Sequence, residues 1–372
     1  MSRKSDELFK KYLNHTCTPE ERAIVESWYN SEAGAADSKD DNVDYQELER
    51  EIRTSIRKSV QPAKRINLRL IAAAAACILI CVLFYYYPVS KNEGRKSEVA
   101  DATQLPAGSN KAELILEDGS VVTLSDGKEG LLTRQNGAVV NKLGSGRLRY
   151  EASSAVPAGI VTFNTLRTPR GGQYQIDLPD GSRAWLNAAS SLRFPTMFDG
   201  AERLVEITGE VYFEVAVNKR KPFKVKTRNQ TVEVLGTHFN VHAYPEESFV
   251  TTTLIEGSVK VWTEQHSVLI KPGEQAMVSG NSQEIKISKA DSEEAVAWKQ
   301  GYFQFNNEDV KSIMRKLSRW YDIEVLYSKD FVNQQFSGSV SRFEDAAKVL
   351  KMLEFTGTVH FEIEGRRVTV MP

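Results

Sequence analysis

The residues whose types could support metal chemistry lie in one stretch of alternating sequence. Of the five histidines, His238 and His242 lie near each other, four positions apart in GTHFNVHAY. Residues at this spacing share one face of a β-strand. Their Cα atoms would be about 13 Å apart there, too far for both side chains to bind one metal ion. The sequence therefore predicts no metal site, and nothing in it calls for a cofactor.

Two carboxylates could support acid–base chemistry. Asp177 and Asp180 flank a turn, an arrangement that a glycosidase could use as its acid and base. A tight turn at Asp180-Gly181 explains the second carboxylate equally well, because an Asp side chain hydrogen-bonds the backbone two residues on. Arg170-Gly171-Gly172 lacks the spacing of a phosphate-binding loop. The chain is therefore predicted not to be an enzyme, and an envelope hydrolase is kept as a weaker alternative.

The elements that carry these residues alternate with period two. In EVYFEVAV the apolar residues Val211, Phe213, Val215 and Val217 share one face, which is typical of a half-buried strand. Asp-Gly and similar turn pairs recur from residue 118 to residue 280, with no long helical pattern between them. We expect a mainly antiparallel all-β domain over residues 100–290.

A faint repeat lies within this region. KAELILEDGSVVTL (Lys111 to Leu124) and QYQIDLPDGSRAWL (Gln173 to Leu186) match at Leu-x-Asp-Gly-Ser with an offset of 62 residues. Each predicts a strand, an Asp-Gly turn and a returning strand. Two independent hairpins with common turn chemistry explain the match as well as a true duplication does.

The last segment, residues 298–372, changes pattern to strand, helix and strand, twice over. NEDVKSIMRKLSRWY places five apolar residues on one helical face. These are Val310, Ile313, Met314, Leu317 and Trp320. The segment predicts an α+β domain built on a β-α-β repeat. The strand RRVTVM is expected at a sheet edge, where Val368, Thr369 and Val370 could pair with a partner strand.

The N-terminal part has a different character. Residues 1–67 predict short amphipathic helices, one of which starts at the cap Thr18-Pro19-Glu20-Glu21. Such a short all-α segment either forms a small bundle or completes its core against another protein, and its size favours the second. The apolar residues offered for such contact are Leu8, Tyr12, Leu13, Ile24 and Trp28.

Residues 68–88 are predicted to form a transmembrane helix. Leu70 to Tyr87 are eighteen uncharged residues, about 27 Å long as a helix. Six basic residues precede the span and three follow it, which predicts a cytoplasmic N-terminus. The expected fold class is therefore a short all-α segment, one transmembrane helix, an all-β domain and an α+β domain. The expected localisation is the bacterial inner membrane, single-pass, with the C-terminus in the periplasm.

Composition adds two limits. Net charge is −1 with 48 basic and 49 acidic residues, so no overall electrostatic footprint for nucleic acid is present. The three cysteines, Cys17, Cys77 and Cys81, all precede the predicted outer domains, which therefore have neither a disulfide framework nor a cysteine nucleophile. A glycan-binding module remains a further alternative, with Trp185, Trp262 and Trp298 as its candidate aromatics.

Several sequence blocks in one order resemble the FecR family of membrane-bound anti-sigma factors. They are LPDGSRAWLNAASSLRFP (178–195), VEITGEVYFEVA (205–216), PFKVKT (222–227), VEVLGTHFNVHAY (232–244), LIEGSVKV (254–261) and LIKPGEQA (269–276). The last seventy residues are similar to the domain that often follows in this family, itself similar to the short signalling domain of secretins and TonB-dependent receptors.

The resemblance implies two partners and no catalytic residues. The N-terminal segment, with Leu8, Tyr12, Thr18, Glu21 and Trp28, is similar to the family's sigma-binding region, although the motif is loose. It would bind an extracytoplasmic-function sigma factor. The outer domains would receive a signal from the N-terminal domain of a TonB-dependent outer-membrane receptor. The resemblance does not distinguish an inhibitor from an activator.

Overall fold

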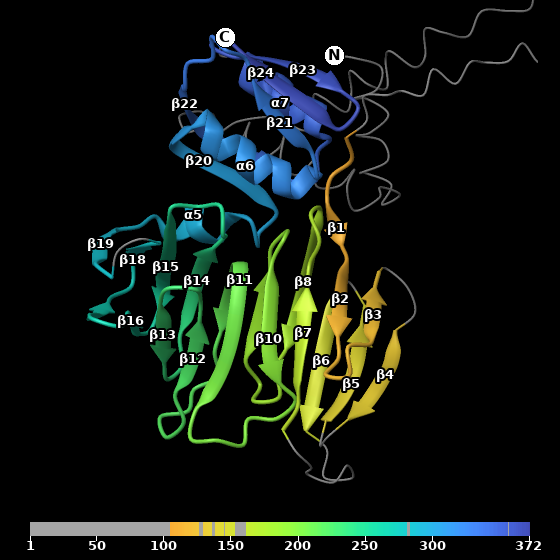
Figure 1. Ribbon diagram of the computed structural model, residues 1–372, viewed down its shortest axis with the longest axis vertical. Helices are drawn as coiled ribbons and strands as arrows, with labels where there is room; N and C mark the ends of the chain where they lie inside the picture. Colours follow the sequence, from red (N-terminus) through yellow and green to blue (C-terminus); the bar gives the residue numbers. More distant parts are fainter. Residues whose placement is uncertain are drawn as a thin grey trace, which may run out of the picture. The chain divides into compact units, whose positions relative to one another are not determined.

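The computed structural model describes residues 105–372, with gaps at 126–128, 136–137, 145, 153–160, 281–282 and 356. The described residues belong to one compact unit. Within it we call residues 109–289, with strands β1–β19, the β domain, and residues 302–371 the C-terminal domain (Figure 1). Helix α5 (Ser292–Ala297) connects them.

The β domain contains two sheets. The first sheet has the order β3 (Val121–Leu124), β2 (Ala112–Ile115), β7 (Phe163–Arg167), β10 (Ser191–Pro195), β11 (Arg203–Glu214), β12 (Phe223–Lys226), β13 (Thr231–Val234), β16 (Val259–Trp262) and β17 (Ser267–Ile270). The second has the order β4 (Gly130–Gln135), β5 (Ala138–Leu143), β6 (Arg147–Ala152), β8 (Gly172–Asp177), β9 (Arg183–Leu186), β11, β14 (His238–Ala243), β15 (Phe249–Glu256), β18 (Glu274–Ser279) and β19 (Ile285–Lys289). Most neighbouring strands are antiparallel, as short hairpin connections require.

Strand β11 belongs to both sheets. Its residues up to Thr208 pair with β10 in the first sheet, and its residues from Gly209 pair with β14 in the second. Gly209 has a φ of 81°, and a Cβ there would lie 2.7 Å from the Cα of Ser190. Glycine is therefore required where the strand passes from one sheet to the other.

Alternate residues of both sheets form one hydrophobic core. On β11 the inward residues Val205, Val211 and Phe213 are almost fully buried, and Phe213 stacks on Phe239 with ring centroids 5.2 Å apart. The period-two pattern thus orients each strand, because a strand that presents its apolar face inward has a single favourable register.

The two repeated segments form hairpins with the same turn. In each turn a Gly with positive φ follows the Asp. The Gly amide donates to a Leu carbonyl, and the Ser amide donates to the Asp carboxylate. The residues are Leu116, Asp118, Gly119 and Ser120 in the first hairpin and Leu178, Asp180, Gly181 and Ser182 in the second. The identical hydrogen bonding follows from the local Asp-Gly-Ser sequence, so both explanations of the repeat remain open.

The C-terminal domain contains two helices and five strands. In chain order these are β20 (Tyr302–Asp309), α6 (Val310–Tyr321), β21 (Glu324–Tyr327), β22 (Gln335–Ser341), α7 (Ala346–Glu354), β23 (His360–Glu364) and β24 (Arg367–Met371). Strands β20 and β22 form an antiparallel pair, and β24 lies between β21 and β23 in a second sheet. Asp309 and Asp345 cap the two helices through their side chains.

Helix α6 buries the face that its sequence predicts. Val310, Ile313, Met314, Leu317 and Trp320 are each at most 1% exposed and belong to a second hydrophobic core. That core also contains Leu105 and Ala188, which come from outside the C-terminal domain.

The predicted fold class and localisation require correction. The described residues are predominantly β, with 24 strands and three helices, because period-two alternation dominates their sequence. Among them, no helix combines the length and apolar character needed to cross a bilayer. Within the described residues the structure therefore shows neither the predicted transmembrane helix nor the predicted single-pass inner-membrane localisation. Residues 1–67 and 68–88, on which the all-α segment and the span depended, lie outside the described residues.

Candidate functional site

The histidines lie on one strand, as their spacing predicts, and do not converge. Both belong to β14; His238 contacts Glu256 at 3.2 Å through Nδ1, whereas His242 lies against the ring of Tyr244 with centroids 4.9 Å apart. Over the described residues no group of three or more His, Cys, Asp or Glu side chains is arranged to hold a metal ion.

Each candidate catalytic carboxylate has a structural partner. Asp177 accepts hydrogen bonds from Arg147 and Arg149, at 2.6 Å and 3.1 Å. Asp180 accepts from Ser182 in its own turn and pairs with the buried Arg203 at 2.7 Å. Carboxylates held in this way stabilise the β domain, and the arrangement gives no support to hydrolase chemistry.

The candidate glycan-binding aromatics do not form a platform. Trp298 is 8% exposed and donates its indole N–H to Asn240. The ring of Trp185 is covered by Lys299 at 4.0 Å, and Lys260 lies 3.7 Å from the centroid of Trp262. Each ring therefore already has a stabilising contact.

The predicted partner-binding strand is not at an edge. Strand β24 pairs with β21 on one side and with β23 on the other, and Val368 and Val370 are fully buried. The expectation that Val368, Thr369 and Val370 pair with a partner strand is therefore wrong, because their backbone groups already bond within the sheet. The sigma-binding candidates Leu8, Tyr12, Leu13, Ile24 and Trp28 lie outside the described residues.

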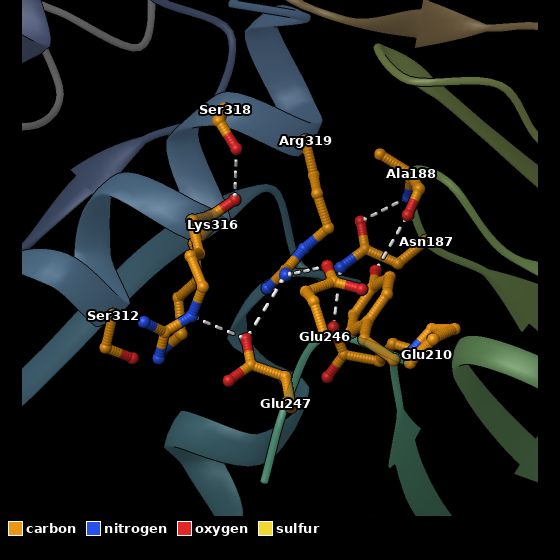
Figure 2. A network of polar contacts seen from close by, with 12 residues as sticks. Asn187, Ala188, Glu210, Glu246, Glu247, Ser312, Lys316, Ser318 and Arg319 are labelled. Atoms are coloured by element: carbon orange, nitrogen blue, oxygen red, sulfur yellow. Dashed lines mark hydrogen bonds and ion pairs between the residues drawn. The ribbon is translucent and has the colours of Figure 1, made fainter. Parts of the chain in front are cut away.

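Charged residues gather instead where the C-terminal domain meets the β domain, a region that we call the junction. Arg319 of α6 extends toward the loop after β14, where it contacts Glu246 at 2.8 Å and Glu247 at 3.2 Å (Figure 2). Arg315, one turn earlier, contacts Glu247 at 2.9 Å. The Arg319 guanidinium also lies 3.9 Å from the ring centroid of Tyr244. Helix α6 is thus held to the β domain by two arginines and two glutamates.

Arg170 forms a second contact of the junction, from the β domain. Its guanidinium donates to the carbonyls of Ser318 and Ile323, at 2.7 Å and 2.8 Å, and to the carboxylate of Asp322. The next residue, Gly171, donates its amide to the carbonyl of Arg319 at 2.7 Å. Two carbonyls in the last turn of α6, those of Ser318 and Arg319, therefore accept hydrogen bonds from the β domain.

Arg342 forms the third contact, as part of a closed ring of hydrogen bonds. It is 1% exposed and donates to Asn187 Oδ1 and to the carbonyl of Trp298, both at 2.6 Å. Asn187 donates to Glu210, which also accepts from Asn240, and Asn240 accepts from Trp298. One amide side chain thus separates the Arg342 cation from the Glu210 carboxylate.

Burial shifts several pKa values at the junction. It lowers the pKa of Arg342 to about 10 and raises the pKa of Tyr244, whose hydroxyl donates to the carbonyl of Ala188. Burial also lowers the pKa of His242. For Glu247 burial acts in the raising direction, but the hydrogen bond from Arg315 and the nearby cations outweigh it and lower the pKa. Arg342 and Glu247 are therefore charged at neutral pH.

Local sequence patterns do not single out these residues. Arg170 lies in Arg170-Gly171-Gly172, which lacks the spacing of a phosphate-binding loop, and no chemical motif includes Arg319 or Arg342. One local indication was present: Arg319 and Arg342 each adjoin an aromatic residue, in Arg319-Trp320 and Arg342-Phe343. Their partners Asn187, Glu210 and Glu247 are distant in sequence, so no spacing connects them.

The arrangement can hold two domains together through ion pairs and hydrogen bonds. Between β14, β15 and α6 lies a cavity of about 410 Å³ lined mainly by polar side chains, among them Glu210, Asn240 and His242. Small-molecule sites are usually lined by apolar side chains, so the cavity does not indicate one. Fold and site together define a protein of two domains joined by ion pairs and hydrogen bonds.

The comparisons with known proteins identify the family. Residues 164–260 match the FecR protein family, and residues 302–370 match the FecR C-terminal family. A crystal structure at 1.65 Å of a candidate anti-sigma factor from Parabacteroides distasonis is 31% identical with a TM-score of 0.52, and the match covers 55% of this chain and 97% of the other. A second structure, at 2.50 Å, is 30% identical with a TM-score of 0.53 over 56% and 98%.

No curated protein matches the chain. The chain belongs to the FecR family, as the sequence blocks predicted. Members of this family are generally regulators rather than enzymes.

Proposed function

We propose that this chain is an anti-sigma regulator that binds an extracytoplasmic-function sigma factor through residues 1–67. We propose further that its C-terminal domain receives a signal from the N-terminal domain of a TonB-dependent outer-membrane receptor. The observation that carries the proposal is the presence of both FecR matches on two domains held together by a charged junction.

The character of the junction supports a regulatory role. Many of its contacts are ion pairs and hydrogen bonds made by Arg170, Arg319 and Arg342, beside the apolar contact of Ala188 with the core of the C-terminal domain. Polar interfaces between domains are typical of parts that move relative to each other. A partner that binds one domain could therefore change how the two are docked.

Sigma binding is tested with the full-length chain and the extracytoplasmic-function sigma factors of the same organism. Calorimetry should show a complex that Leu13→Asp or Trp28→Ala weakens at least tenfold, because each removes an apolar contact. The control is Leu269→Asp on β17, where the native side chain is 62% exposed. Absence of a complex with the unaltered chain would refute the proposal.

For the receptor, the free edge of β21 replaces β24 as the proposed docking strand. The two edge strands of the sheet are β21 and β23. Strand β23 exposes Glu362 and Glu364, and edge charges oppose strand pairing. Strand β21 has one exposed charge, Glu324, which pairs with Arg367 at 3.3 Å, and it exposes Leu326 and Tyr327, at 41% and 37%, beside a groove lined by α6. An extended partner segment could pair with this edge.

The matched test uses one lysine on each edge. Leu326→Lys should weaken receptor-domain binding about tenfold, and Glu362→Lys on β23 should change it less than about twofold. The opposite ranking would place the docking strand at β23. Equal affinity in both variants would count against edge pairing altogether.

A further inference from the structure

The segment that precedes the β domain is bound by the C-terminal domain. Leu105 is 2% exposed and lies in the hydrophobic core of the C-terminal domain, with Ala107 packed against the same cluster. In Figure 1 this orange segment runs from β1 toward the blue C-terminal domain. We call residues 105–108 the strap. Everything earlier in the chain, including the proposed sigma-binding region, joins the described domains through it.

The strap supplies a hydrogen-bond acceptor to the N-terminus of helix α7. The first amides of a helix have no partner within the helix. In α7 the amide of Ala347 donates to the cap residue Asp345, and the amide of Ala346 donates to the carbonyl of Leu105 at 3.0 Å. The strap therefore supplies both an apolar side chain and a helix-capping acceptor to the C-terminal domain.

Gly108 fits the strap against Trp320. A Cβ on Gly108 would lie 2.7 Å from the indole ring, so glycine alone fits without displacement. Trp320 is 1% exposed and donates its N–H to the carbonyl of Arg342 at 2.6 Å. The strap thus contacts the same tryptophan that Arg342 covers at 3.8 Å.

The next residues belong to the β domain. Strand β1 (Ser109–Asn110) pairs in parallel with Gly172 and Gln173 of β8. The Ser109 amide donates to the carbonyl of Gly171 at 2.9 Å, and the Gly171 amide donates to Arg319 of the C-terminal domain. One residue, Gly171, therefore connects the end of the strap to the junction.

The strap is too short to remain bound at both ends when the domains separate. From Leu105 to Ser109 the chain has four residue steps, which reach at most about 14 Å when fully extended. If the two domains separate so that Leu105 and Ser109 would lie farther apart than this reach, either Leu105 leaves its core or the two-residue strand β1 detaches. Docking of the domains and order in the strap are therefore linked, and linkage is reciprocal.

We propose that the strap is the transmission element of this protein: it is held only while the C-terminal domain is docked, and undocking releases the segment that leads to the N-terminal region. The inference concerns the chain itself and rests on the proposed function only for the partner that shifts the equilibrium. A failure of sigma or receptor binding would leave it standing.

The test is single-amide hydrogen exchange in the full-length chain carrying Arg170→Ala. This variant removes the contacts of Arg170 with Ser318, Ile323 and Asp322, and leaves every strap residue unchanged. We expect the Gly171 amide, at the junction, and the Ala346 amide, at the strap, to exchange faster by the same factor, about tenfold or more. The matched control is Arg193→Ala, which breaks the surface pair with Glu206 within the first sheet.

The outcomes are distinct. Unchanged exchange at Ala346, whether or not Gly171 accelerates, overturns the proposal. If amides inside α6 exchange faster by the same factor, the C-terminal domain has unfolded. The milder Asp322→Asn variant then decides by the same comparison, because it removes only the charge that pairs with Arg170 and Arg366 and keeps a side chain of the same size. The linkage should also act from the strap to the junction. Leu105→Ser should therefore make the Gly171 amide exchange faster, whereas the control Leu131→Ser, at a position 53% exposed on β4, should leave that exchange unchanged.

Discussion

Arg342 Nη2 lies 2.6 Å from Asn187 Oδ1, and this hydrogen bond joins residues 155 positions apart. The Asn187 amide nitrogen in turn donates a hydrogen bond to the Glu210 carboxylate at 2.7 Å. A buried cation is thus compensated through a neutral amide rather than by a direct ion pair. Such an arrangement favours a docked state without the cost of desolvating a second charge beside the first.

Arg342→Ala should destabilise the C-terminal domain by about 3 kcal/mol, because it removes both buried packing and hydrogen bonds. Arg342→Met keeps much of the packing on Trp320 without burying a charge, so its loss should be less than half as large. The measurement is denaturant unfolding followed by tryptophan fluorescence. Arg193→Met, at an arginine with a 46% exposed side chain, is the control. Equal losses for the two Arg342 variants would contradict this account.

Stability should fall as pH decreases below about 6.5 because of His242. Its folded-state pKa is lowered by burial from 6.5, so below that pH the unfolded state binds a proton that the folded state does not. His242→Gln should flatten the dependence of the unfolding free energy on pH between about 5 and 7. The exposed His266→Gln variant should retain it. An unchanged slope in His242→Gln would show that another group is responsible.

The two Asp-Gly-Ser turns allow a matched test of a buried ion pair. Asp180→Ala leaves the Arg203 guanidinium, with a 2% exposed side chain, without its carboxylate, and should cost about 3–5 kcal/mol. Asp118→Ala removes the corresponding turn hydrogen bond at an exposed site and should cost far less. Chemical denaturation of both variants measures the difference. Similar losses would mean that the turn, and not Arg203, dominates the role of Asp180.

Gly209→Ala should destabilise the β domain by about 2–4 kcal/mol, because it adds left-handed strain and a collision with Ser190. Gly273→Ala has the same φ of 81° and nothing within 4 Å of the new Cβ, so it should cost only about 1 kcal/mol. Thermal unfolding of the two variants separates strain from collision. If Gly209→Ala lowers the stability no more than Gly273→Ala does, Ser190 moves aside at little cost and the collision is unimportant.

Local patterns were sufficient for individual elements and turns. The period-two stretch around Val211 forms β11, the five apolar residues from Val310 to Trp320 form the buried face of α6, and Asp180-Gly181 forms a tight turn. Each of these depends on residues only a few positions apart, because the face on which a side chain lies and the conformation of a turn are determined by local steric effects. Family membership followed from such blocks taken in order.

Long-range pairing could not be inferred in the same way. The alternation of β24 is equally compatible with an edge and with a central strand, and only its pairing with both β21 and β23 shows that Thr369 is unavailable to a partner. Likewise Arg319 becomes a junction residue because folding places α6 against Glu246 and Glu247, more than seventy positions away. Local sequence specifies which face of an element is apolar; which charges meet across two domains depends on how the packed elements bring distant residues together.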